Sequence, residues 1–247
     1  MLRGLCLRKA ALVSLFAGLV CLSGWGQEPG GVGGRQSYGF SWSYSPDSSH
    51  ILIGLAQQRS TWTLGFEYTH RIHSGKRFRL DYEGSFLPVY EETDPTVIGT
   101  KTTLGKNTIV TSEPPIRVVT VDHGPVGTAS VVGGVSAPIY AIFSRESTYA
   151  EALAPIGGRV SMFPRSRIQP SFSIDTGFVV SSRDLPVDKA DQFNYMFSFG
   201  PGVQVYTGAR SSLRVEYILR HISNAHQGYQ NPGVDQGVFR LTLSRHR

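Results

Sequence analysis

The sequence predicts an all-β protein, an eight-stranded antiparallel transmembrane β-barrel with one long loop insertion. Three observations lead to this prediction. The chain begins with an export signal, most of the remainder alternates apolar and polar residues, and charges of both signs stay in the polar rows of the alternating segments. Alternating strands of about ten residues in an exported chain are typical of barrels that span a membrane.

Residues 1–26 have the layout of a secretory signal peptide. Basic residues come first, an uncharged apolar run follows over residues 10–22, and small residues precede the expected cleavage point. The mature chain is therefore expected to be residues 27–247. Both cysteines, Cys6 and Cys21, lie inside the signal, which excludes disulfides and thiol chemistry from the mature protein.

The composition excludes two further classes of protein. The formal net charge of +6 includes the three basic residues of the signal, so the mature chain keeps only a mild positive excess. That excess is too small to indicate nucleic-acid binding. After the signal no apolar run reaches the roughly 20 residues of a membrane helix. The mature length fits one all-β unit or two small domains.

Three strands are expected before residue 91, because a strand places residues i and i+2 on the same side. Residues 38–44, 61–72 and 77–90 each carry an apolar row on one side and a polar row on the other. The apolar rows are Phe40, Trp42 and Tyr44; Trp62, Leu64, Phe66 and Tyr68; and Phe78, Leu80 and Tyr82. The stretch HILIGL, residues 50–55, is a candidate extension of the first strand.

Residues 91–148 form the least regular part of the chain. They contain several prolines and a short apolar run over residues 118–121, with little alternation. We expect a long loop or insertion here, with room for a small hairpin. Alternation then resumes in five segments. Their ranges are 154–163, 170–181, 194–207, 212–223 and 236–244.

The charged residues decide between a barrel and a soluble sandwich, whose strands also alternate. Charges of both signs can pair inside a narrow barrel but would be costly in the core of a sandwich. The polar rows hold Glu67, Asp81, Glu83, Arg159, Asp175, Arg214, Glu216 and Arg220. A closed barrel leaves no unpaired backbone edge in lipid, and eight strands leave an interior filled by side chains, which excludes a pore. We therefore expect a protein of the cell outer membrane.

His221 and Ser223 stand in an unusual place for polar residues, since they continue the apolar row of the strand 212–223. Asp235 continues the apolar row of the strand 236–244 in the same way. Because consecutive strands are usually neighbours, Asp235 can lie beside His221. A carboxylate that orients a histidine, which in turn activates a serine, is the usual arrangement for acyl transfer. Here the three residues would face the membrane.

The end of the chain resembles the outer-membrane lipid A 3-O-deacylases of the PagL type. The resemblance rests on the stretch RHISNA, on an acid fourteen residues after the histidine, and on an asparagine in a proline-containing loop between them, Asn231-Pro232. It implies that His221 is the general base, Ser223 the nucleophile and Asp235 the residue that holds the imidazole. Asn231, with Asn224, would supply hydrogen bonds to the oxyanion.

The resemblance also implies the partners of the protein. The substrate would be lipid A or lipopolysaccharide in the outer leaflet, no cofactor would be needed, and a homodimer stays open. The chain departs from the family by having Asp235 in place of a glutamate, and His226 in place of a glycine. A glutamate at position 235 is therefore expected to raise or preserve activity.

A second hypothesis comes from another class of protein, a structural or adhesion barrel that acts through residues 91–148. The two hypotheses differ in whether lipid A loses an acyl chain when the protein is produced. A metal site at His70 and His73 is not expected, because their spacing places them on opposite faces of a strand and no third ligand is evident.

Overall fold

The computed structural model describes residues 33–104, 106–130 and 136–247. The predicted signal peptide, residues 1–26, lies outside the described residues. In the part of the chain that is described, no helix is long and apolar enough to cross a membrane.

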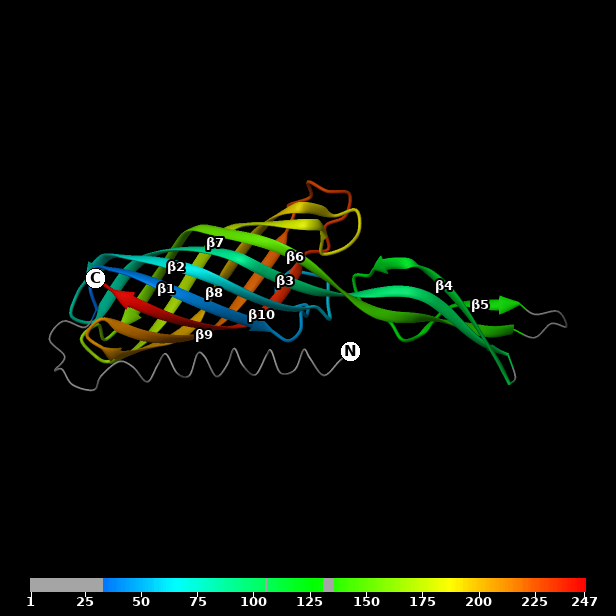
Figure 1. Cartoon of the computed structure of the whole chain (residues 1–247), viewed down its shortest axis with the longest axis horizontal. Helices are drawn as coiled ribbons and strands as arrows, with labels where there is room; N and C mark the ends of the chain where they lie inside the picture. The colour runs from blue at the N-terminus through cyan, green and yellow to red at the C-terminus, as the bar shows by residue number, and fades with distance from the viewer. Residues whose placement is uncertain (1–32, 105, 131–135) are drawn as a thin grey trace.

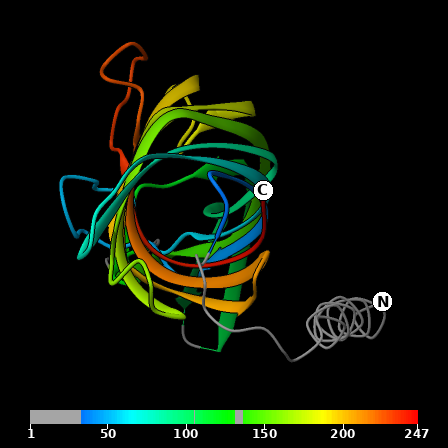
Figure 2. The same ribbon diagram turned by 90° about the vertical axis from the view of Figure 1, so that its left-hand side faces the viewer.

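All regular structure in the described residues is antiparallel β-sheet. The strands are Gln36–Ser45 (β1), Ser60–Ser74 (β2), Phe78–Leu104 (β3), Asn107–Arg117 (β4), Pro125–Ser130 (β5), Ser136–Met162 (β6), Ile168–Leu185 (β7), Asp191–Gly208 (β8), Ser211–Ser223 (β9) and Val234–His246 (β10). Their order in the sheet is β4-β3-β2-β1-β10-β9-β8-β7-β6-β5, and β3 also pairs with β6. This extra pairing closes a ring of eight strands, seen end-on in Figure 2, with β4 and β5 outside it. The predicted all-β antiparallel fold with eight ring strands is confirmed.

The prediction for residues 91–148 is a long loop or insertion with a small hairpin. The loop is wrong, because strands occupy most of this range, whereas an insertion with a hairpin, β3 with β4, is present. β3 and β6 are 27 residues long each and remain paired from Phe78/Met162 to Thr102/Ile139. They therefore continue past the ring, and with β4 and β5 they form a sheet that projects from it, which we call the extension (Figure 1). Alternation arises only where one face of a strand is buried. Nearly every residue of β4 is exposed, so this strand of the extension has no such pattern.

The two ends of the ring differ in their connections. At the turn end, on the left in Figure 1, the connections are the short segments 75–77, 163–167 and 209–210. At the opposite end, the loop end, they are two longer segments, 46–59 and 224–233, the short segment 186–190, and the extension. Residues 50–55 lie in the 46–59 loop, so the expected continuation of the first strand through HILIGL is wrong.

Buried charges of opposite sign pair inside the ring. Arg214 Nη1 lies 2.5 Å from Glu83, and its Nε lies 3.1 Å from Glu216. Arg214 Nη2 contacts Glu67. Arg240 reaches the same group, with its Nε 2.6 Å from Glu216. The predicted pairing of charges inside the ring is confirmed, since each carboxylate of this group faces at least one guanidinium.

The outer surface of the ring is apolar. The outward side chains follow the predicted apolar rows, and they include Trp42, Phe66, Phe78, Phe172, Ile174, Val215 and Phe239, all exposed. A soluble protein rarely exposes a contiguous apolar surface of this extent. The ring thus reverses the usual arrangement of a water-soluble fold, with charges inside and hydrocarbon outside.

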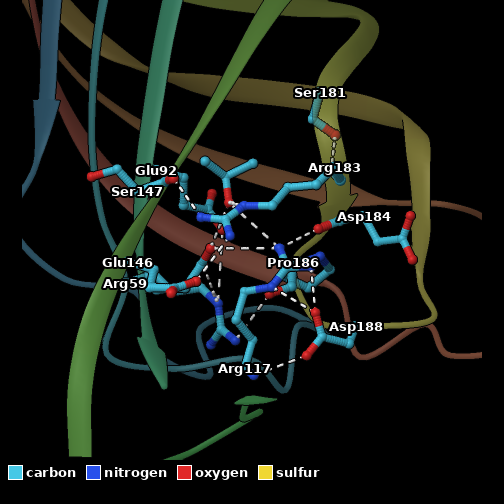
Figure 3. Close-up of polar contacts among 12 residues, drawn as sticks. Arg59, Glu92, Arg117, Glu146, Ser147, Ser181, Arg183, Asp184, Pro186 and Asp188 are labelled. Carbon is cyan, nitrogen blue, oxygen red and sulfur yellow. Dashed lines mark hydrogen bonds and ion pairs between the residues drawn. The ribbon is translucent and has the colours of Figure 1, made fainter. Parts of the chain in front are cut away.

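A buried arginine ties the loop end of the ring together (Figure 3). Arg59, fully buried at the end of the 46–59 loop, has its Nε 3.0 Å from Asp94 on β3. It also donates hydrogen bonds to the carbonyl of Val118 after β4, at 2.6 Å, and to that of Pro186 before β8, at 3.3 Å. One side chain therefore joins three connections to the wall of the ring.

A second arginine holds the base of the extension. Arg117 ends β4, and its Nη2 lies 2.7 Å from Asp188 in the 186–190 connection. The backbone N–H of Arg117 donates to the same carboxylate, at 3.0 Å. Nearby, Arg183 on β7 pairs with Glu146 on β6 at 2.9 Å (Figure 3). These contacts fix the position of β4 relative to the ring.

Replacing Arg117 with alanine is expected to loosen the extension and leave the ring intact. Loss of hydrogen bonds to a charged partner costs about 2 kcal/mol, which corresponds to about a 30-fold faster amide exchange in β4. Hydrogen exchange followed by mass spectrometry would measure this rate. Lys101→Ala, a change at an exposed residue of β3 in the extension, is the matched control. Equal exchange in the two variants would contradict the role of Arg117.

The same contact gives a pH dependence. Partial burial raises the pKa of Asp188, but the hydrogen bonds from Arg117 outweigh this effect and hold the pKa below its ordinary value. The contribution of the contact to stability is thus fully present above about pH 4, the ordinary pKa of an aspartate, and it is lost as the pH falls through the lowered pKa. Exchange in β4 should therefore rise only under strongly acidic conditions.

Candidate active site

His221 and Ser223 lie at the end of β9, on the outer face of the ring. Both are half-buried, whereas their neighbours Arg220 and Ile222 are buried and point inward. The outward row of β9 continues toward the turn end with Tyr217, which is exposed. The orientation predicted from the spacing in sequence is therefore the one in the structure.

Asp235 is the second residue of β10 and lies directly opposite His221. The two residues are paired in the register of β9 and β10, and His221 Nδ1 is 2.6 Å from Asp235 Oδ1. Because a carboxylate accepts hydrogen bonds, this contact assigns the imidazole proton to Nδ1. The other nitrogen, Nε2, is buried and has no hydrogen-bond partner among the described residues. The lone pair of Nε2 is therefore free to accept a proton, because no other group in the described part of the chain donates a hydrogen bond to it.

Ser223 follows His221 by two residues on the same face of β9. In the described part of the chain no hydrogen bond joins its hydroxyl to His221. Bonds between a nucleophile and its base are often long before substrate binds. The structure thus brings the acid and the histidine into contact, and places the serine on the same face of β9, two residues after the histidine.

The two asparagines of the expected oxyanion site have different surroundings. Asn224 is buried, and its side chain organises the 224–233 loop. Its Nδ2 donates to the carbonyl of Gln230 at 2.8 Å, and its Oδ1 accepts from the N–H of His226 at 3.0 Å. Asn231 accepts a hydrogen bond from the N–H of Asn224 through its Oδ1, at 3.2 Å. This contact does not use Asn231 Nδ2, whereas Asn224 Nδ2 already donates to Gln230. Asn231 is therefore the better candidate for the hydrogen-bond donor to the oxyanion.

Two features of the site were not predicted from the sequence. The 46–59 loop covers Asp235, and the N–H groups of Leu52 and Gly54 donate to its Oδ2, at 2.6 and 2.8 Å. Backbone donors are independent of residue type, so no motif reveals them. Gly233 has a φ of +61°, and a Cβ there would lie 3.0 Å from His221 Cε1. A glycine shortly before a strand was the available signal for this second feature.

The surface around the site is apolar. On β8, Tyr195 is paired with Ser223 and Phe197 with His221, and both aromatic side chains are exposed. On the other side, the 46–59 loop exposes Ile53, with 72 % of its surface accessible. The polar groups of the site are thus bordered on both sides by hydrocarbon.

A metal centre finds no support in the described residues, where no group of three or more His, Cys, Asp or Glu side chains could hold an ion. His70 and His73 lie near the turn end of β2, far from the site along the strand.

Comparisons with known proteins give structural similarity only. No family model and no curated protein matches the chain. Among solved structures, the outer-membrane enzyme PagL is 12 % identical over 83 % of this chain and 97 % of that chain, with a TM-score of 0.49. Neisserial surface protein A is 10 % identical over 85 % and 97 %, with a TM-score of 0.41. An outer-membrane channel from Pseudomonas putida F1 is 9 % identical over 89 % and 99 %, with a TM-score of 0.29. These similarities are too low to indicate an activity.

Proposed function

We propose that this protein is an outer-membrane serine esterase that removes an ester-linked acyl chain from lipid A. The observation that carries the proposal is the short contact between His221 Nδ1 and Asp235 Oδ1, which leaves Nε2 without a hydrogen-bond partner among the described residues, on the face of β9 that also carries Ser223. The arrangement lies on the outer, apolar face of the ring, which favours an ester with a long hydrocarbon chain over a water-soluble one. The motif RHISNA and the spaced acid support the same activity by resemblance, including the 3-O position.

The membrane location follows from the distribution of polarity. An outer surface of aromatic and aliphatic side chains matches lipid, and a closed ring leaves no backbone edge unpaired there. Short turns at one end and long connections at the other are the usual form of outer-membrane barrels, with the long connections outside the cell. His221, Ser223 and Asp235 would then meet the outer leaflet.

The reaction needs only groups of the chain and water. Ser223 Oγ attacks the ester carbonyl, and His221 Nε2 takes its proton while Asp235 stabilises the imidazolium. The Nδ2 of Asn231 would donate to the oxyanion, a contact worth about 3 kcal/mol of barrier. His221 returns the proton to the sugar oxygen as the ester bond breaks. Water then releases the fatty acid from Ser223 by the same steps.

The mass of lipid A from a Gram-negative host tests the proposal. Cells that produce the wild-type protein should lose the mass of one hydroxyacyl chain, whereas cells that produce Ser223→Ala should keep it. The alanine variant must reach the membrane in the same amount, which its heat-dependent migration on a gel would show. Identical spectra from the two strains would refute the esterase and favour a structural or adhesion barrel that acts through the extension.

A further inference from the structure

The 46–59 loop folds back over the first residues of β10. The N–H of Ser49 donates to the backbone carbonyl of Asp235 at 3.2 Å, and the N–H of Leu55 donates to the carbonyl of Pro232 at 2.6 Å. The loop therefore holds the backbone at Asp235 itself and three residues before it. Because this backbone is fixed, the Cα from which the carboxylate of Asp235 extends has a defined position.

The same loop binds the carboxylate directly. Asp235 Oδ2 accepts hydrogen bonds from the N–H groups of Leu52 and Gly54, while Oδ1 accepts from His221 Nδ1. The two oxygens thus have different partners, so the carboxylate cannot rotate without losing hydrogen bonds. Its side chain is almost fully buried, although its parity on β10 is that of the outward row. The covering loop is the cause of that burial.

The loop is itself fixed at its base. Ser48 Oγ accepts a hydrogen bond from the N–H of Arg59 and donates one to the carbonyl of Ala56, both at 3.1 Å. Arg59 is then held by its ion pair with Asp94 inside the ring. A loop anchored in this way is able to impose a position on the group that it binds.

We propose that the 46–59 loop is a positioning element of the active site, and that the site it forms is fitted to an aspartate and not to a glutamate. This inference rests on the proposed function. Leu52 and Gly54 act through Asp235, so they are positioning residues. Their part in the reaction is to keep Oδ1 directed at the imidazole while the charge on His221 rises and falls.

The space around Asp235 explains the choice of acid. A Cβ at Gly54 would lie 2.6 Å from Asp235 N and 2.9 Å from Asp235 Cγ, so the loop backbone packs directly on Asp235. Both carboxylate oxygens already have hydrogen-bond partners at 2.6–2.8 Å, in the loop and on His221. A glutamate would carry its carboxylate about 1.5 Å further, the length of one carbon–carbon bond, into the loop or into His221. A shift of about 1 Å costs about 100-fold in rate. The resemblance alone favours glutamate at position 235, whereas the geometry points to the opposite result.

Two variants test the inference, with hydrolysis of a p-nitrophenyl fatty-acid ester by the full-length protein in detergent micelles. Gly54→Ala and Asp235→Glu should each lower kcat by about 100-fold and change KM less than twofold, because neither touches the groups that meet the acyl chain. Gly75→Ala is the matched control. It lies in the turn between β2 and β3, where the nearest atom to an added Cβ is 3.5 Å away, and it should keep the wild-type kcat.

A second measurement separates this inference from the proposed function. The proton on His221 Nδ1 should give a strongly downfield NMR signal in the wild type and in Gly75→Ala, and the signal should be lost in Gly54→Ala. An unchanged signal in Gly54→Ala overturns the inference whether or not the protein hydrolyses esters. Asp235→Glu with a kcat equal to or above that of the wild type also overturns it. An inactive wild type with the expected signals would refute the esterase and leave the positioning role standing.

Discussion

Replacing His221 with asparagine is expected to lower the kcat for ester hydrolysis by about 10⁴-fold or more. Asparagine has no nitrogen that accepts a proton, so Ser223 would have to attack as a neutral hydroxyl. The carboxylate of Asp235 would also lose its ion-pair partner at the transition state. KM should change little, because the exposed aromatic side chains that border the site, Tyr195 and Phe197, remain in place. Steady-state kinetics with a fatty-acid ester in micelles would give both constants.

The control for this variant is a histidine of the same chain outside the site. His73 is exposed at the end of β2, and His73→Asn should retain the wild-type kcat. A fall of the same size in both variants would indicate a general loss of folded protein. A kcat for His221→Asn within tenfold of the wild type would remove His221 from the reaction and with it the proposed mechanism.

The ring could be predicted from the sequence because each of its strands separates two environments. Outward residues such as Phe66 and Phe239 are exposed and apolar, whereas inward residues such as Glu67 and Arg240 are buried and charged. That separation repeats every second residue, which is the period of a strand. The extension gave no such signal at β4 because nearly every residue of this strand is exposed, so neither of its faces is buried. HILIGL gave a misleading signal, since its apolar residues belong to a loop that hydrogen bonds fix over β10.

The site could be predicted where it depends on two rules: residues i and i+2 of a strand lie on the same face, and consecutive strands are neighbours. The outward positions of His221 and Ser223, and the contact of Asp235 with His221, follow from these two rules. The remaining contacts depend on tertiary structure. The N–H groups of Leu52 and Gly54 come from a loop more than 180 residues earlier in the chain, as the separations of 183 and 181 residues from Asp235 show. No local pattern encodes such a pairing.

Replacing Arg214 with methionine is expected to lower the free energy of unfolding by about 3–5 kcal/mol. The guanidinium is buried and contacts Glu67, Glu83 and Glu216 inside the ring. Methionine fills a similar volume but leaves these carboxylates close together with fewer positive partners, and the interior offers little water to stabilise them. Unfolding in urea, followed by tryptophan fluorescence in lipid vesicles, would measure the change.

Two further variants show whether charge, and not volume, causes this loss. Arg210→Met changes an exposed residue of the turn between β8 and β9 and should leave the unfolding midpoint within error of the wild type. Adding Glu67→Gln to Arg214→Met removes one of the three carboxylates that lost a positive partner, so it should restore part of the stability. If Arg214→Met unfolds at the same urea concentration as Arg210→Met, the ion pairs inside the ring contribute nothing net. The closed ring would then be held by its backbone hydrogen bonds and its apolar outer surface, with the interior charges serving only to fill it.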